Sequence, residues 1–187
     1  MDLSLRKLLR SFYNRKTTEV ALDLLGKYLV YTKNGYEQIG KIVEVEAYVG
    51  PHDLACHASK GKTKRTALMF GPPGYSYIYL IYGIYHCLNV VTEEAGSGTA
   101  VLIRALEPIK NISLKTQGPG LLCKALQLDK QLNGYDLLSD DFYLAESENA
   151  QSFQVITKPR IGVAYAAEWA EAPLRFYIEG NPFVSKR

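Results

Sequence analysis

Two glutamates lie two positions apart in a segment that alternates between polar and apolar residues. Within Ile42–Tyr48, the alternation places Glu44, Glu46 and Tyr48 on one face of a predicted strand. Each strand step rises about 3.3 Å, so the Cα atoms of the two glutamates are about 6.6 Å apart. This arrangement allows a carboxylate general base beside an aromatic ring, or the carboxylate pair of a glycosidase. The alternative is a half-exposed strand whose polar face meets water.

Tyrosines are concentrated further along the chain. Of the 14 tyrosines, a dense group lies between Tyr75 and Tyr85, where an ordinary core strand would use Val, Ile and Leu. Each tyrosine offers a flat ring and a polar hydroxyl, which suits flat ligands with polar edges. Nucleobases are such ligands, because stacking a base on an aromatic ring contributes roughly 1–3 kcal/mol. A two-sided strand whose hydroxyls reach water is the alternative.

Two polar residues interrupt segments that otherwise have the pattern of apolar strands. Arg104 lies in Val101–Leu106, and Asn89 lies in Cys87–Val91. A buried guanidinium needs a carboxylate or water partner, and a buried amide must be hydrogen-bonded. Arg104 is therefore either half of a structural salt bridge or part of a site, and Asn89 could hydrogen-bond the edge of a bound base.

Basic residues cluster just before the tyrosines, at Lys60, Lys62, Lys64 and Arg65. Such a run is usually a solvated loop. Beside an aromatic platform it also suits contact with phosphates, which dominate the affinity of proteins for nucleic acids. The net charge of +3 is too small to decide between the two interpretations.

The composition is that of a globular protein. With 187 residues and 47% hydrophobic content, the chain is predicted to form a single domain over residues 1–187. Its apolar stretches are far shorter than the roughly 18 residues that a membrane helix needs, and its first residues lack the apolar core of a secretory signal. Three scattered cysteines fit a reducing cytosol, and with three scattered histidines we expect no metal site and no cofactor.

The periodicity of the chain predicts a few helices and many strands. Helical spacing is weak over Leu3–Phe12 and clearer over Thr18–Leu25, and Gly118-Pro119-Gly120 begins a helix that ends near Leu126. The predicted strands are Tyr28–Thr32, Gln38–Tyr48, Tyr75–Ile81, Cys87–Thr92, Ala100–Leu106, Ile161–Val163 and Leu174–Ile178. Because these strands do not alternate strictly with helices, we predict an α+β fold. It would be one domain with a curved, largely antiparallel sheet, flanked by helices and with a protruding β-hairpin.

Taken in order, these segments resemble the alkyladenine (3-methylpurine) DNA glycosylase family of the mammalian type. The resemblance extends over nearly the whole chain. Its matches are Ile42–Pro51, Asp53–His57, Met69-Phe70, Gly74–Tyr85, Leu88-Asn89, Val101–Pro108, Gly118-Pro119-Gly120, Pro159–Val163, Trp169, Pro173–Tyr177, Gly180 and Val184-Ser185. Any one of these motifs alone would be weak, and their number and order make the resemblance specific.

The resemblance implies excision of damaged purines from double-stranded DNA by hydrolysis of the N-glycosidic bond. The implied substrates are alkylated or deaminated purines (3-methyladenine, 7-methylguanine, hypoxanthine, ethenoadenine), and the product is an abasic site for base excision repair. Glu46 is expected to activate the attacking water, and Arg104 to help hold that water. The enzyme is expected to be monofunctional and monomeric, cytoplasmic if bacterial and nuclear if eukaryotic.

The resemblance also implies how the base is held. The rings of Tyr48, His57 and Tyr79 are expected to stack on the flipped base, and Asn89 to screen against the exocyclic amine of guanine. Tyr82, followed by a glycine at a hairpin tip, is expected to fill the gap left in the duplex. Flipping costs a few kcal/mol, and the cost is smallest for damaged pairs.

Two other functions fit parts of the sequence. A non-catalytic nucleic-acid-binding module would use the tyrosines for stacking but gains nothing from Glu46, since a carboxylate repels phosphates. A carbohydrate glycosidase would pair Glu44 with Glu46. The basic run and a projecting Tyr82 do not serve a neutral oligosaccharide, which argues against that reading.

Overall fold

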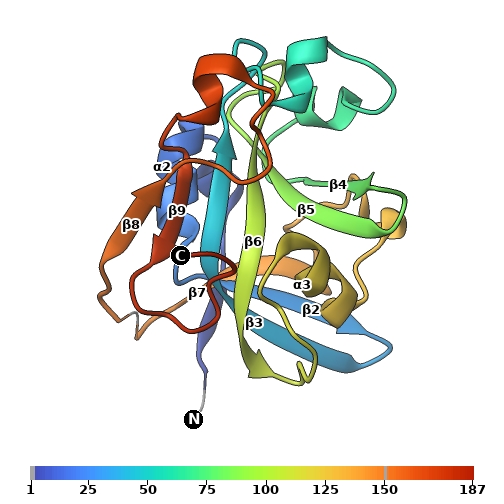
Figure 1. The fold of residues 1–187 in the computed structure, drawn as a ribbon. Helices are drawn as coiled ribbons and strands as arrows, with labels where there is room; N and C mark the ends of the chain where they lie inside the picture. The colour runs from blue at the N-terminus through green and yellow to red at the C-terminus, as the bar shows by residue number, and fades with distance from the viewer. Residues whose placement is uncertain (1–2, 150) are drawn as a thin grey trace.

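The computed structural model describes residues 3–149 and 151–187. Its strands are β1 (Leu5–Lys7), β2 (Tyr28–Lys33), β3 (Tyr36–Tyr48), β4 (Ser76–Ile81), β5 (Tyr85–Thr92), β6 (Thr99–Lys110), β7 (Phe142–Ser147), β8 (Val155–Lys158) and β9 (Arg175–Ile178). They form one antiparallel sheet in the order β1-β7-β2-β3-β6-β5-β4, with β9 paired to β3 and β8 to β9 (Figure 1). The predicted α+β class with a largely antiparallel sheet is confirmed.

The helices are few and short. They are α1 (Arg10–Tyr13), α2 (Thr17–Leu24) and α3 (Pro119–Leu126), with the 3₁₀ helices η1 (His57–Lys60), η2 (Ala67–Phe70), η3 (Lys130–Leu132) and η4 (Ala167–Ala170). None of the helices in the described parts of the chain is long and apolar enough to cross a membrane.

Strand β3 is enclosed on both edges where it carries its two glutamates. Glu46 is opposite Leu102 of β6 on one edge and opposite Arg175 of β9 on the other. The pairing with β6 shifts register on both sides of Glu44. Such irregularities re-aim side chains next to functional sites. Val43 and Val45 lie in the main core on the other face, so this stretch of β3 is covered on every side.

The hairpin of β4 and β5 projects from the sheet (Figure 1). Its turn is closed by a hydrogen bond from the Ile84 amide to the Ile81 carbonyl, with φ of +53° at Tyr82 and +69° at Gly83. Positive φ at both central residues is what a type I′ hairpin turn requires, and glycine at the second meets it without strain. Tyr82 is 86% exposed as a result.

Helix α3 fits against β5 and β6 and begins as the sequence predicted. Gly118 has a φ of +142°, and Pro119 stands at the start of the helix. Gly120 is needed for a different reason: a Cβ atom there would lie 2.8 Å from the ring of Tyr85. The close approach of ring and backbone sets the position of the hairpin relative to the helix.

Several predicted elements are wrong or incomplete. Most of Leu3–Phe12 is not helical, because β1 pairs with β7, a strand that local periodicity did not reveal. The apolar Ile161–Val163 is not a strand, because Gly162 turns the chain with a φ of +79°. Strand β6 does not end at Glu107-Pro108 but reaches Lys110, with a register shift beside Pro108 that accommodates its missing N–H.

Candidate active site

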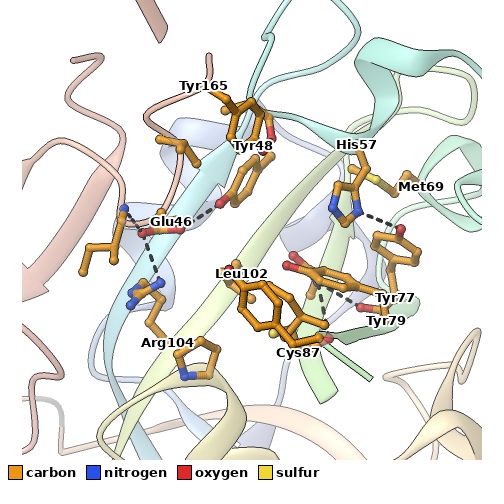
Figure 2. A pocket seen from close by; sticks show the side chains of 18 residues that line it. Glu46, Tyr48, His57, Met69, Tyr77, Tyr79, Cys87, Leu102, Arg104 and Tyr165 are labelled. Atoms are coloured by element: carbon orange, nitrogen blue, oxygen red, sulfur yellow. Dashed lines mark hydrogen bonds and ion pairs between the residues drawn. The ribbon is translucent and has the colours of Figure 1, made fainter. Parts of the chain in front are cut away.

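A cavity of about 210 Å³ opens between the hairpin, η1, the ends of β3 and β6, and the loop after Arg160. A water molecule occupies roughly 30 Å³, so the cavity is several times larger than one water and has room for a flat ligand made of rings. All the site residues predicted from the sequence line it, namely Glu46, Arg104, Tyr48, His57, Tyr79, Asn89 and Tyr82. They come from four strands, the 3₁₀ helix η1 and the hairpin turn. Figure 2 shows the side chains of Glu46, Tyr48, His57, Tyr79 and Arg104 around this space.

Glu46 is fully buried and holds three hydrogen-bonding or ionic partners. One carboxylate oxygen, Oε1, accepts the Ile161 amide at 2.8 Å and lies 3.2 Å from Nη1 of Arg104. The other, Oε2, accepts the Tyr48 hydroxyl at 2.8 Å (Figure 2). A carboxylate has about four acceptor positions, so one position on Oε2 is left for a further donor.

Burial also sets the proton affinity of Glu46. Loss of solvent raises the pKa of this carboxyl, against the opposing effects of Arg104 and of the Ile161 and Tyr48 hydrogen bonds. A raised pKa makes the ionised carboxylate a better proton acceptor near neutral pH.

Arg104 joins the two glutamates of β3. Its Nε lies 3.1 Å from Oε1 of Glu44, and its Nη1 faces Oε1 of Glu46. Its third nitrogen, Nη2, is 3.4 Å from the Ser185 hydroxyl. Arg104 is 7% exposed and borders the cavity. Its guanidinium is held in place by Glu44 and Glu46 of β3 and by Ser185.

Glu44 does not share the cavity with Glu46. It also receives Nη1 of Arg175 at 3.1 Å and the Ser185 amide at 2.7 Å, and it is absent from the described residues that line the cavity. The interpretation of β3 as a half-exposed strand is wrong, since both carboxylates are 0% exposed. The paired-carboxylate arrangement of a glycosidase loses its geometric support, because only Glu46 of the two borders the cavity.

The aromatic walls are fixed by contacts with one another. His57 and Tyr79 meet edge to face with ring centres 4.5 Å apart, and the Tyr77 hydroxyl is 3.0 Å from Nδ1 of His57. Burial, with help from the Arg65 charge, lowers the pKa of His57, so the imidazole is neutral at pH 7. The neutral imidazole therefore adds an aromatic face to the wall without adding a positive charge of its own.

Asn89 lies at the floor of the cavity and is 3% exposed. Its amide nitrogen donates to the Tyr77 carbonyl at 3.1 Å, across the β4–β5 ladder. This bond fixes the orientation of the amide group.

The sequence did not assign roles to Arg160 or Asp53, which hold residues of the cavity wall in place. They form a buried two-pronged ion pair at 2.6 and 2.8 Å, and the Arg160 guanidinium stacks on the Tyr48 ring at 4.7 Å. The next residue, Ile161, provides the amide that binds Glu46. Both residues stood in matched motifs, but only the folded chain brings them together across 107 positions.

Of the basic run, Arg65 lies next to an aromatic wall of the cavity. Lys60, Lys62, Lys64 and Arg65 are all exposed, and the Arg65 guanidinium is 5.8 Å from the centre of the Tyr79 ring.

Comparison with known proteins adds independent information. A family model described as methylpurine-DNA glycosylase matches residues 11–182. A provisionally named 3-methyladenine DNA glycosylase of Legionella pneumophila (strain Paris) is 65% identical over 182 residues, covering 97% of this chain and 100% of that protein. Proteins with the same provisional name from Alkaliphilus oremlandii and Myxococcus xanthus are 46% and 48% identical, covering 97% and 94% of this chain and 100% and 92% of their own.

Proposed function

The chain belongs to the methylpurine-DNA glycosylase family, and we propose that it excises damaged purines from duplex DNA with Glu46 as the general base. As a member of this family it is a DNA glycosylase that hydrolyses an N-glycosyl bond. The proposed substrates are 3-methyladenine, 7-methylguanine, hypoxanthine and ethenoadenine. The product is DNA with an abasic site.

One observation carries the proposal: a buried carboxylate borders an aromatic cavity and keeps one acceptor position unused. Three donors hold Glu46 in a fixed orientation, and Oε2 is the oxygen with a free position. A water bound there would sit beside a base stacked on Tyr48 or Tyr79. Positioning of this kind is what a general base needs before its pKa matters.

The reaction then follows from the chemistry of the damaged nucleotide. The water oxygen bonds to C1′ of the sugar as the C1′–N9 bond breaks, and the bonding electron pair leaves with the purine. The water proton passes to Glu46. Before that transfer the carboxylate stabilises the positive charge that develops on the sugar, as in other reactions with an oxocarbenium-like transition state. A purine that is already cationic through alkylation needs no proton to depart.

Arg104 is proposed to help position the water. Its guanidinium borders the cavity and is anchored by Glu44, which leaves its orientation independent of the substrate. Because Arg104 also contacts Oε1 of Glu46, it keeps that oxygen occupied and leaves Oε2 as the one that acts.

Tyr82 is proposed to fill the gap in the duplex while the damaged nucleotide is everted. Its ring is 86% exposed at a hairpin tip and still borders the cavity, so it can stand in the base stack next to the entrance. An inserted side chain offsets part of the cost of unstacking. The same arrangement has no use in a carbohydrate glycosidase.

Release of free purine from duplexes with one defined lesion tests the proposal. We expect the wild-type protein to release the damaged base, with activity falling as salt rises because phosphate contacts are lost. No borohydride-trapped adduct is expected, since the proposed mechanism is monofunctional. Failure to release any of these lesions would contradict the function, and hydrolysis of a synthetic glycoside would favour the carbohydrate alternative.

Two further features belong to the proposal. We propose that the enzyme acts as a monomer, as expected of an enzyme that scans DNA. The relatives named above come from bacteria, and a cytoplasmic location, where bacterial DNA lies, follows from that source.

A further inference from the structure

A second hollow of about 490 Å³ lies on the other side of the hairpin tip. The hairpin contributes Tyr79, Ile81 and Tyr82 to the catalytic cavity and Ile84, Tyr85 and His86 to this second hollow. In Figure 1 the hairpin projects with the segment of residues 57–70 on one side and with α3 and the end of β2 on the other. The exposed tip therefore separates two concave surfaces.

Helix α3 connects the two hollows. Pro119 at its start lines the catalytic cavity, whereas Gly120, Cys123 and Lys124 line the second hollow. Eight residues of α-helix span about 12 Å. The helix also fixes the hairpin, since the Tyr85 ring packs on Gly120 with no space for a side chain there.

The second hollow combines cations with apolar groups. Lys33 and Lys124 are exposed, and neither has an ion-pair partner within residues 3–149 and 151–187. Ile84 and Tyr85 are 71% and 44% exposed beside them. Among the described residues that line the hollow, the one acid is Asp129, which caps η3 by accepting the Gln131 amide at 2.8 Å. The exposed lining suits a passing polyanion better than an enclosed small molecule.

We propose that this second hollow carries the undamaged strand of the duplex, with Lys33 and Lys124 on its phosphates and Ile84 and Tyr85 against its sugars. The inference rests on the proposed function, because it takes Tyr82 as the inserted side chain. Neither Lys33 nor Lys124 is among the described residues that line the catalytic cavity, whereas Arg65 of the basic run lies over the Tyr79 ring of that cavity.

The physical argument concerns the two sides of an inserted side chain. A side chain that enters the duplex between base pairs has one strand on each side. If the damaged nucleotide turns into the catalytic cavity, its strand passes on that side, and the undamaged strand must pass on the other. The minor groove is about 6 Å wide and opens when a side chain is inserted, so a protein surface of about 12 Å can meet both strands. The hollow lined by Lys33 and Lys124 lies where the second strand must run.

DNA in which one strand carries uncharged backbone linkages identifies the strand that Lys33 and Lys124 contact. The variant is Lys33→Gln with Lys124→Gln, and its matched control is Lys16→Gln with Lys158→Gln, which removes the same charge next to α2 and on β8. Binding is measured on lesion duplexes with methylphosphonate linkages opposite the lesion in the undamaged strand, in the damaged strand, or in neither.

On the unmodified duplex we expect the variant to bind more weakly than the control, with a slope of log affinity against log salt that is smaller by about 1.8, or about 0.9 for each lost phosphate contact. We expect this difference to vanish when the undamaged strand is neutral and to persist when the damaged strand is neutral. A difference that vanishes with the damaged strand, or no difference from the control, would overturn the proposal. Wild-type excision is recorded in parallel, and its absence would count against the proposed function rather than against the strand assignment.

Discussion

The two glutamates of β3 lie two residues apart and in opposite kinds of environment. Glu44 is bound by Arg104, Arg175 and the Ser185 amide, and it lies outside the catalytic cavity. Glu46 borders that cavity, with one arginine, one amide and one hydroxyl as partners. Both are fully buried, so burial alone does not distinguish a structural carboxylate from a catalytic one. The difference is whether the carboxylate borders the cavity where a substrate fits.

The largest effect is expected for Glu46→Gln. The amide has the shape of the carboxylate and can keep its contacts with Ile161 and Tyr48, but it cannot take a proton from water. We expect the single-turnover excision rate to fall by about 10²–10⁴-fold, which is the usual contribution of a general base. Affinity for the lesion duplex should be unchanged or tighter, since a charge that repels phosphates is removed. An unchanged excision rate would show that the base has been assigned to the wrong residue.

The next effect belongs to Glu44→Gln and is one of stability. Removing this charge leaves Arg104 with Glu46 as its carboxylate partner. It leaves Arg175 without a carboxylate partner among the described residues. We expect the free energy of unfolding in urea to fall by about 3 kcal/mol, near the lower end of the range for a broken buried pair. Excision by the folded fraction should fall much less than in Glu46→Gln. Equal losses of excision would revive the paired-carboxylate mechanism.

Tyr48→Phe should change the pH dependence of excision, because Tyr48 contacts Glu46 and not Glu44. The Tyr48 hydroxyl lowers the pKa of Glu46 by hydrogen bonding to the carboxylate, so its loss raises that pKa further. A base is active when ionised, and the acid limb of single-turnover excision should therefore move to higher pH. Measurements on a neutral lesion such as hypoxanthine are best, because its leaving group carries no permanent charge. A limb that does not move would mean that another group controls it.

The smallest effect is a gain in stability for Glu46→Gln near neutral pH. The folded-state pKa of Glu46 is raised above its ordinary value of 4.5, so the folded protein binds this proton more tightly than the unfolded chain. Ionised Glu46 therefore lowers the free energy of unfolding as pH rises through and above that value, and the amide avoids this cost. We expect Glu46→Gln to unfold at a higher temperature than wild type at pH 7, with a difference that shrinks as pH falls toward 4.5. A difference that grows on acidification would reverse the assigned shift.

The sequence predicted the elements that carry the cavity better than the contacts that set its chemistry. The alternation around Glu46 and the Tyr82-Gly83 turn are local patterns, and both predict the strand and the tip correctly. What separates Glu44 from Glu46 is not local, since Arg175 and Ser185 lie 131 and 141 positions away from Glu44. The spacing of Glu44 and Glu46 along β3 therefore does not distinguish the structural carboxylate from the catalytic one.

The apolar Ile161–Val163 illustrates the same limit. Its composition is typical of a strand, but the Ile161 amide donates to Glu46 instead of to a neighbouring strand. The choice depends on Arg160, whose ion pair with Asp53 fixes this loop against the end of β3. No local pattern in the sequence reports such a contact.

The most direct test of Glu46 as the base supplies a replacement from solution. Glu46→Ala removes the carboxylate and leaves a space beside the cavity that formate can enter, and Glu44→Ala serves as the control. We predict that single-turnover excision by Glu46→Ala is very slow and rises with formate concentration, whereas excision by the folded fraction of Glu44→Ala does not respond to formate. Excision by Glu46→Ala at the wild-type rate without formate would contradict the account, as would rescue confined to Glu44→Ala.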